Sequence, residues 1–560
     1  MQPPVAMDTI SRPELYCRTL VGTAPHLCVM TLFAGLFQLG ALPALASESI
    51  SLGADVKVHT LTPTGQTELC ILPKHYLNYD GQDQDRKEEA ELCRLSPYLN
   101  QEIKLEFTSS SKLTSKLFKK TDTKDVILCP KLNSTVPGTN FIDVPKGWSA
   151  EKAIAEFCIE KLEVPIAIAD KYSIEARLKS WFADASASSV LAYYHLSRIL
   201  DVGRVPPAVY RTLERTSHEP VIKRANELLK GSTEHIANNW RALGDASKNA
   251  ARGKPSLKIY TPDGKMLYGA LSKNAKGEEK YTEVSGVGDF VSRYPRFLAQ
   301  PPFQKVADPL GVELLAKSNR IETLAPMIIQ MRDVSGMVLL DSLLSQDDRI
   351  GNIHYKIEVV ENTQSGAHSR ELTKIEKEAA KEELNKARAH LLDKARIASE
   401  QGNAKLAANF RGQSEKIKLT ERLVQKALKS LYPGETKILA KVMILKDNDC
   451  GVDTDPRRRQ NLMRRYGALE RLRHMDPETY RRFLQLADDI LTDRFRPFAI
   501  NTLLYREQDY EGTKVSLKEN ARHALNILKD ACRRGDLKLD LTMKFDDRGR
   551  FVPEPHPGCE

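Results

Sequence analysis

The sequence predicts an α+β fold in which strands dominate the first half of the chain and helices the second. Short runs of β-type residues separated by polar turns recur between residues 47 and 148, a pattern that is typical of strands. In the second half, apolar residues recur at helical spacing between His368 and Leu431. A chain of 560 residues is too long for one hydrophobic core, so we expect two or three domains.

The composition is that of an ordinary globular protein, with 28% charged and 41% hydrophobic residues. The formal net charge of +10 suits an acidic protein, a phosphate group or an anionic surface as partner. This charge is too diffuse to indicate nucleic-acid binding, so we expect no nucleic-acid partner.

Residues 1–46 have the features of an export signal. Arg12 and Arg18 precede an apolar run from Leu27 to Leu42, and Ala44-Leu-Ala46 supplies a cleavage site with small residues. The run is too short and too interrupted for a convincing membrane span. We therefore expect a periplasmic or secreted protein with no membrane span after cleavage; a retained signal anchor is the alternative.

Seven of the nine cysteines follow the signal. Four of them fall in the β-rich region or just after it and would form two bridges in an oxidising compartment, most simply Cys70–Cys93 and Cys129–Cys158. The remaining three, Cys450, Cys532 and Cys559, are an odd number. A bridge from Cys450 would hold the acidic loop in which it lies.

Strands and helices alternate between residue 149 and residue 269. Ser149 is a plausible N-cap for the first helix, and Asp263-Gly264 is a hairpin turn. Lys171 lies near the end of a strand of the buried type. The predicted segments are a helix at Ser149–Lys161, a strand at Val164–Tyr172, a helix at Ser188–Leu200, an extended segment at Val205–Thr212 and a hairpin at Leu257–Gly269.

The first motif with chemical content follows an apolar helical run, Met337–Leu344. Asp347, Asp348 and Arg349 end that run, and Asn352 comes four or five residues after the carboxylates, before a strand-like segment. Phosphoryl transfer needs a carboxylate that orients the attacking hydroxyl and a nearby amide oxygen that holds a metal ion. A solvated helix end followed by a turn is the alternative interpretation.

The second motif begins roughly 85 residues after Asn352, where the strand Lys437–Leu445 leads into Asp447-Asn-Asp-Cys-Gly451. A kinase needs a second carboxylate at the end of such a strand to chelate the metal on the nucleotide phosphates. We therefore expect Asn352 and Asp447 to share Mg or Mn, with Asp449 as the alternative to Asp447. A plain acidic hairpin loop is the competing interpretation.

Residues 366–432, between the two motifs, are predicted to be a helical-hairpin insertion. Two periodic runs are separated by Ser399-Glu-Gln-Gly-Asn403 and carry dense Lys and Glu. The flanking strands can pair directly, so we expect an autonomous hairpin that docks a partner or is simply solvated. After the second motif, Asp476 precedes Pro477 as the N-cap of a helical segment. The segment before it carries arginines that would favour an acidic substrate, or form a solvated face: Arg457, Arg458, Arg459, Arg464, Arg465, Arg471 and Arg473.

The two motifs resemble those of atypical kinases, namely secretory-pathway casein kinases, HipA toxin kinases, spore-coat CotH kinases and phosphoinositide kinases. The helix with Tyr193-Tyr-His-Leu-Ser-Arg198, followed by Val205-Pro-Pro207, also looks like a segment of the secretory-pathway kinases. The resemblance covers about residues 160–500. It implies a bilobal kinase-like fold, with an N-lobe at 149–320 and a C-lobe at 321–560, but we find no Gly-rich phosphate loop.

The resemblance also implies roles for single residues. Asp348 is the expected base because Arg349 follows it, as in the family; Asp347 is the alternative because it lies five residues before Asn352. Lys171 and Arg349 are expected to bind ATP, although the Ser188–Leu200 helix offers Lys171 no Glu. The implied activity is phosphorylation of a protein hydroxyl. The rivals are a degenerate kinase fold that acts as an interaction module, and a kinase for a small molecule, sugar or lipid headgroup.

Overall fold

The computed structural model of the protein describes residues 126–560, except for 133–135, 160–168, 175–185, 207, 257–258, 261–262, 273–277, 290–291, 365, 453–460, 502, 504, 506, 513–514 and 557. The predicted signal peptide therefore lies outside the described residues. So do Cys70, Cys93 and the predicted β-rich region up to residue 125.

The first sheet is antiparallel and has the strand order β1-β2-β3-β5-β4. Its strands are β1 (Val126–Pro130), β2 (Gly138–Asp143), β3 (Ala169–Ile174), β4 (Ala208–Glu214) and β5 (Met266–Ser272). The sequence suggests a boundary near residue 148, but β2 pairs with β3 across it. Because this ladder joins strands on both sides of the boundary, β1 and β2 belong to this sheet.

Three helices accompany the first sheet: α4 (Ala150–Phe157), α6 (Arg215–Leu228) and α7 (His235–Ala251). Ser149 caps α4 as predicted, because its Oγ accepts a hydrogen bond from the Lys152 N–H at 3.2 Å. The helix ends at Phe157, before the predicted Lys161, and Cys158 forms a disulfide with Cys129 of β1. This is the pairing expected from the sequence.

Helix α5 (Ala187–Leu200) lies between the first sheet and the helical half of the chain. It contacts β4 and β5 on one side and α12 (Ile321–Leu344) and α17 (Pro477–Leu491) on the other. Every residue of α5 except Arg198 is buried. The helix predicted at Ser188–Leu200 is therefore confirmed, with Ser186 as its N-cap.

The second sheet holds β6 (Glu279–Lys280), β7 (Ile353–Thr363), β8 (Gly366–Glu371) and β9 (Ile438–Leu445). β7 pairs with β9 in antiparallel register from Ile353 opposite Leu445 to Val360 opposite Ile438. The direct pairing of the two strands that flank the insertion is confirmed. This register places Asn352, just before β7, beside Lys446, just after β9.

Helix α12 is the central helix of the second half, and every residue from Asp333 to Leu344 is buried. It packs against α5, β9 and several of the surrounding helices. Because α10 and α11 pack on α12, residues from the end of the predicted N-lobe belong with the helical half. The surrounding helices are α8 (Thr282–Ser285), α9 (Arg293–Leu298), α10 (Pro301–Val306), α11 (Val312–Ala316), α16 (Leu462–Arg465), α17, α18 (Arg496–Asn501), α19 (Glu507–Glu511) and α20 (Leu517–Arg533).

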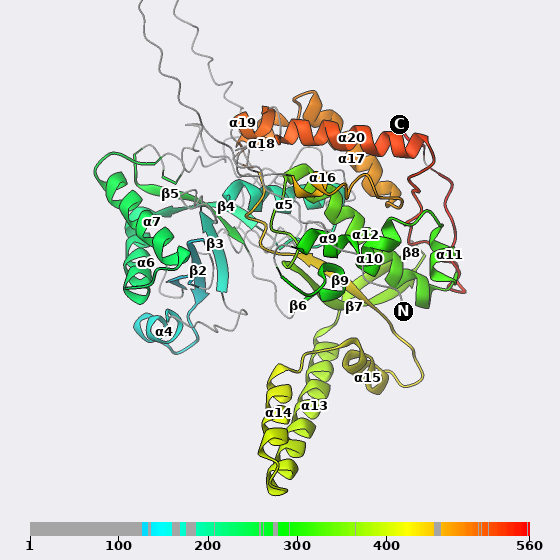
Figure 1. The fold of residues 1–560 in the computed structure, drawn as a ribbon, viewed down its shortest axis with the longest axis horizontal. Coiled ribbons are helices and arrows are strands. Elements are labelled where there is room, and N and C mark those ends of the chain that lie inside the picture. The colour runs from blue at the N-terminus through cyan, green and yellow to red at the C-terminus, as the bar shows by residue number, and fades with distance from the viewer. Residues whose placement is uncertain are drawn as a thin grey trace, which may run out of the picture. The chain divides into compact units, whose positions relative to one another are not determined.

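The segment between β8 and β9 forms α13 (Lys374–Glu400), α14 (Ala404–Lys416) and α15 (Glu421–Leu431). α13 and α14 pack side by side and turn at Gly402, whose φ is +74° (Figure 1). The sequence predicts one helical run after this turn, but the chain breaks at Ile417 and restarts with Thr420 as N-cap of α15. α15 buries Val424 and Leu428 against Val359 of β7, so the segment is not autonomous along its whole length.

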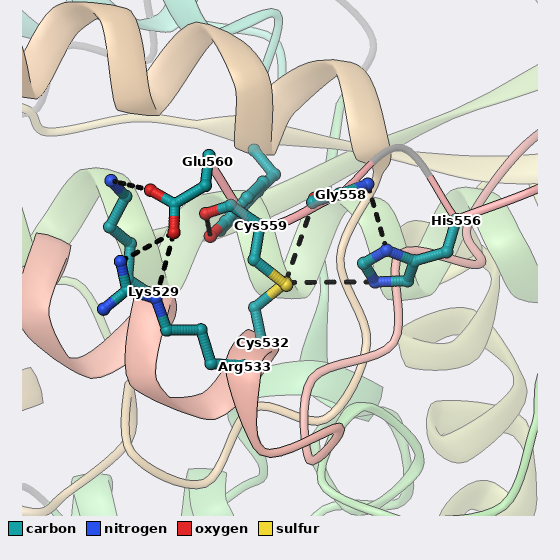
Figure 2. The surroundings of a disulfide bond; sticks show 8 residues. Lys529, Cys532, Arg533, His556, Gly558, Cys559 and Glu560 are labelled. Atoms are coloured by element: carbon teal, nitrogen blue, oxygen red, sulfur yellow. Dashed lines mark hydrogen bonds and ion pairs between the residues drawn. A yellow bond between two sulfur atoms is a disulfide. The ribbon is translucent and has the colours of Figure 1, made fainter.

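Helices α17 and α20 pack on each other in the C-terminal part of the chain. Asp476 caps α17 as predicted, since its Oδ1 accepts from the Thr479 N–H at 2.9 Å. A disulfide joins Cys532 of α20 to Cys559, next to the exposed His556 (Figure 2). In the described part of the chain, Cys450 forms no disulfide, and its thiol donates to Asp449 Oδ1 at 3.9 Å. Among the described residues, no helix is long and apolar enough to cross a membrane.

Candidate active site

The first site loop, loop A (residues 345–352), begins where α12 ends. Ser345 ends the helix in a left-handed conformation with φ of 55°. The last carbonyls of a helix lack partners within it, and Asn520 of α20 supplies one by donating from Nδ2 to the Leu343 carbonyl at 2.9 Å. The same amide donates to the Ser345 Oγ at 2.7 Å. α20 therefore positions the start of loop A.

The second site loop, loop B (residues 446–452), follows β9. The β7–β9 register places the first residues of loop B beside the end of loop A. The Lys446 N–H donates to the Asn352 carbonyl at 3.3 Å, which continues the ladder by one step. The two motifs, about 85 residues apart in the sequence, are thus neighbours in the fold.

Arg349 joins the two loops. Its Nη1 donates to the Lys446 carbonyl at 2.7 Å and its Nη2 to Asn448 Oδ1 at 2.8 Å. Its Nε forms an ion pair with Asp341 of α12 at 3.1 Å. The side chain has 0% exposure. The expected role of Arg349 as a nucleotide ligand is therefore corrected, because its guanidinium has no surface on which ATP could bind.

The Asp341–Arg349 pair is completed by Tyr193 of α5. The tyrosine hydroxyl donates to Asp341 Oδ1 at 2.5 Å, and the Arg349 guanidinium lies 4.9 Å from the ring centre. Burial raises the pKa of Asp341, and Arg349 and Tyr193 oppose this rise. Burial lowers the pKa of Arg349, but Asp341 and Tyr193 together outweigh burial and raise it. The three buried groups satisfy one another and hold loop A against α5 and α12.

Ser189 of α5 holds loop B in the same way. Its Oγ donates to the Asn448 carbonyl at 2.5 Å and accepts from the Gly451 N–H at 2.9 Å. A Cβ at Gly451 would lie 2.7 Å from this Oγ and 2.8 Å from the Leu344 carbonyl. Only glycine fits there, which is the physical reason for the glycine of the second motif. Sequence reasoning missed Ser189 because it lies 262 residues before Gly451.

Asp348 is the carboxylate of loop A that faces loop B. Asn352 Nδ2 donates to the Asp348 carbonyl at 2.8 Å and to its Oδ2 at 3.3 Å. Burial raises the pKa of Asp348, an ion pair with Arg293 opposes this, and repulsion from Asp447 and Asp449 adds to the rise. A carboxylate whose proton affinity is raised is a better general base at neutral pH.

Asn352, Asp447 and Asp449 interact with Asp348 and carry the amide and carboxylate oxygens that hard divalent cations prefer. The amide nitrogen of Asn352 is used within loop A, so its oxygen remains to act as a ligand. Asp447 has a left-handed φ of 48° and is half-buried, whereas Asp449 is buried. Asp447 repels Asp348 more than Asp449 does. Oxygen ligands of these types suit Mg or Mn, and Asp447 is the more exposed of the two loop B carboxylates.

Lys171 and Asp347 are the two remaining predicted site residues. Lys171 lies on β3, opposite Asn140 of β2 and Ser272 of β5. Asp347 is half-buried in loop A and contributes to the raised pKa of Tyr294 of α9, behind burial and Asp341. Sequence reasoning also missed an ion pair. Lys446 at the start of loop B pairs with Glu278, whose side chain is 5% exposed.

The chain is similar to two solved structures. No protein family and no curated protein matches the sequence. A crystal structure of the Golgi casein kinase is similar to the chain with a TM-score of 0.34 and 10% identity, covering 84% of each chain. A second one, with Mn/ADP bound, has a TM-score of 0.36 and 10% identity, covering 81% of this chain and 83% of that chain. At these values, the assignment of the site rests on the contacts described above.

Proposed function

We propose that the protein is an atypical kinase that transfers the γ-phosphoryl group of ATP to a protein hydroxyl. One observation carries this proposal. Asp348 hydrogen-bonds Asn352 in loop A and lies within electrostatic range of Asp447 and Asp449 in loop B. A base, an amide ligand and a chelating carboxylate are the parts that phosphoryl transfer needs at one place.

Each residue has a distinct role in the proposed reaction. Asp348 orients the acceptor hydroxyl and accepts its proton, with Asp347 as the alternative. Asn352 and Asp447 hold the divalent ion, with Asp449 as the alternative. When bound, the ion neutralises charge on the nucleotide phosphates. Lys171 is proposed as a phosphate ligand from β3. Arg349 does not touch substrate in this scheme; it keeps loops A and B in register.

The compartment and the acceptor are also part of the proposal. The disulfides Cys129–Cys158 and Cys532–Cys559 support a periplasmic or secreted protein, since such bonds persist in oxidising compartments. Arg464 and Arg465 of α16, with Arg471 and Arg473 beyond it, would favour an acidic protein acceptor. The helices of residues 366–432 are a candidate docking surface for that protein.

One contact favours a second function. The ion pair between Arg293 and Asp348 occupies the proposed base, as expected in a nucleotide-binding interaction module without catalysis. The same fold would then present ATP-dependent surfaces to a partner. The two proposals differ in whether phosphate leaves the nucleotide.

Isothermal titration and phosphate transfer separate these possibilities. We expect the protein to bind ATP with Mg or Mn and to label an acidic acceptor such as dephosphorylated casein. Asp447→Ala should abolish metal-dependent binding, whereas Asp348→Asn should keep it and lose transfer. Asp245→Ala is the control, because this carboxylate is 74% exposed on α7. Binding without transfer in the unaltered protein, or no binding at all, would favour an interaction module and refute the kinase.

A further inference from the structure

The cation that pairs with Asp348 comes from outside the two motifs. Arg293, the first residue of α9, donates from Nη1 to Asp348 Oδ1. Its side chain is 26% exposed, in contrast to the fully buried Arg349. Arg293 thus sits at the solvent-accessible side of loop A, where a substrate can reach it.

The position of α9 does not depend on this ion pair. Tyr294, the next residue, is buried; its hydroxyl donates to the Gln346 carbonyl at 3.2 Å and its ring stacks on Tyr466 at 5.4 Å. The Gln346 side chain in turn accepts from the Asp348 N–H at 3.1 Å. Tyr294 therefore anchors the start of α9 on loop A, and the Arg293 guanidinium can change partners without moving the helix.

Arg293 brings a positive charge to the carboxylates of loop A. Asp347, Asp348, Asp447 and Asp449 are four carboxylates on the two loops, and the charge of the nearby Arg349 is already matched by Asp341. In phosphoryl transfer, charge spreads over the three equatorial oxygens of the transferred group. A guanidinium matches such oxygens with paired N–H donors.

The base fixes where this cation would act. An acceptor hydroxyl bound to Asp348 lies within one hydrogen bond of its carboxylate and attacks phosphorus directly. A guanidinium bonded to the same carboxylate is therefore only a few ångströms from the transferred group.

We propose that Arg293 binds the transferred phosphoryl group of ATP, and that its ion pair with Asp348 is the resting arrangement that ATP displaces. This inference rests on the proposed kinase function. In the transfer step, the bond between the acceptor oxygen and the γ-phosphorus forms as the bond from that phosphorus to the bridging oxygen breaks. The electron pair leaves with ADP, the hydroxyl proton passes to Asp348, and Arg293 stays protonated throughout.

The test compares the affinities for ATP and ADP in the presence of Mn, measured by isothermal titration on the full chain. Arg293→Gln, which removes the charge but keeps a donor, should weaken ATP binding about tenfold and leave ADP binding unchanged. The ATP affinity of Arg293→Lys should lie between that of the wild type and that of Arg293→Gln. Arg296→Ala is the matched control, because Arg296 lies on the same helix and bonds Ser292 and Asp289; it should keep the wild-type ratio.

The transfer rate with dephosphorylated casein gives the second readout. Arg293→Gln should lower kcat at least tenfold beyond its effect on ATP affinity. An unchanged ratio of ATP to ADP affinity with a lowered rate would show that Arg293 only positions Asp348, and would overturn the inference. A wild-type protein that binds no ATP would overturn the kinase proposal itself. Equal transfer rates for the wild type and Arg293→Gln would overturn this inference but leave the kinase proposal standing.

Discussion

At the scale of residues, the site depends on charges that are buried and matched. Arg349, Asp341 and Tyr193 come from loop A, α12 and α5, and none of the Arg349 or Asp341 side chains is exposed. Removing one member of a buried pair leaves the other charge without a partner, whereas removing both leaves an apolar gap that can be filled. Replacing one member of the pair should therefore lower the free energy of unfolding much more than replacing both.

Arg349→Met should lower the free energy of unfolding by about 3–5 kcal/mol, because Asp341 is left buried without its cation. The double variant Asp341→Leu/Arg349→Met should recover most of this loss in urea unfolding. It should still bind ATP poorly, since Lys446 and Asn448 of loop B lose their donors. A double variant that binds ATP like the wild type would show that Arg349 does not align the loops.

Asp333 is a second buried carboxylate, away from the proposed metal ligands. It lies on α12, and its Oδ2 accepts from the Met443 N–H of β9 at 2.8 Å. Burial raises its pKa from 3.8 to about 7, against the opposing effects of that N–H, Arg204 and Arg332. In the unfolded chain the carboxyl ionises near pH 4. The folded form therefore binds the proton between pH 4 and 7, and stability falls as the pH rises through that window.

Asp333→Asn should remove this dependence while keeping an oxygen for Met443. The variant should match the wild type near pH 4 and become progressively more stable than it up to about pH 7. The difference should reach a few kcal/mol, at about 1.4 kcal/mol per unit of pKa. Urea unfolding across pH measures it, with the exposed Asp245→Asn as control. A difference that stays constant with pH would contradict the assignment.

At the scale of elements, residues 366–432 divide into a base and a tip. The base is β8, the start of α13 and α15, and it buries Val424, Ala427 and Leu428 with Val359 of β7. The tip is the far part of α13 with α14. Its two helices meet where the Ser414 Oγ donates to the Arg388 carbonyl at 3.4 Å. The narrow apolar stripe of the sequence describes the tip well and the base poorly.

Replacing residues 389–413 with a Gly-Ser-Gly-Ser turn should leave a cooperative thermal transition and metal-dependent ATP binding. The cut joins residues that are already neighbours and exposes little apolar surface. Removing all of residues 366–432 should instead abolish cooperative unfolding, because Val359 loses its cover. Loss of transfer to a protein acceptor in the tip variant, with ATP binding intact, would identify the tip as a docking element. Failure of the tip variant to fold would show that α14 supports the sheet.

At the scale of the whole molecule, the C-terminal tail is tied to the helix that holds loop A. The Cys532–Cys559 disulfide closes a loop of 27 residues, and Glu560 pairs with Arg533 (Figure 2). The disulfide belongs to α20, and the Asn520 of α20 holds Ser345. The tail therefore stabilises an element that positions the proposed base.

The double variant Cys532→Ser/Cys559→Ser should lose about 3 kcal/mol of stability, the effect of opening a loop of this length in the unfolded chain. Thermal unfolding under non-reducing conditions measures the loss. Cys450→Ser, at a cysteine that forms no disulfide among the described residues, should change stability by much less. Equal effects of the two replacements would show that the bond adds nothing to the fold.

The sequence by itself determined the features that depend only on residues close together in the chain. Ser149 and Asp476 are read as N-caps because a cap bonds a backbone N–H three residues on, and both are caps in the structure. The helix at 188–200 and the two strands that carry loops A and B were predicted from periodicity. The order of the two motifs likewise follows from the chain.

Only the tertiary structure decided which groups meet across long distances. The sequence does not distinguish Arg349, which is fully buried, from Arg293, which is partly exposed, because their burial depends on how α5, α9 and α12 pack around loop A. Ser189 reaches Gly451 across 262 residues, and β2 joins β3 across a predicted boundary. Periodicity indicates which face of a segment is apolar. It does not indicate which element covers that face, or which charged group lies opposite a buried one.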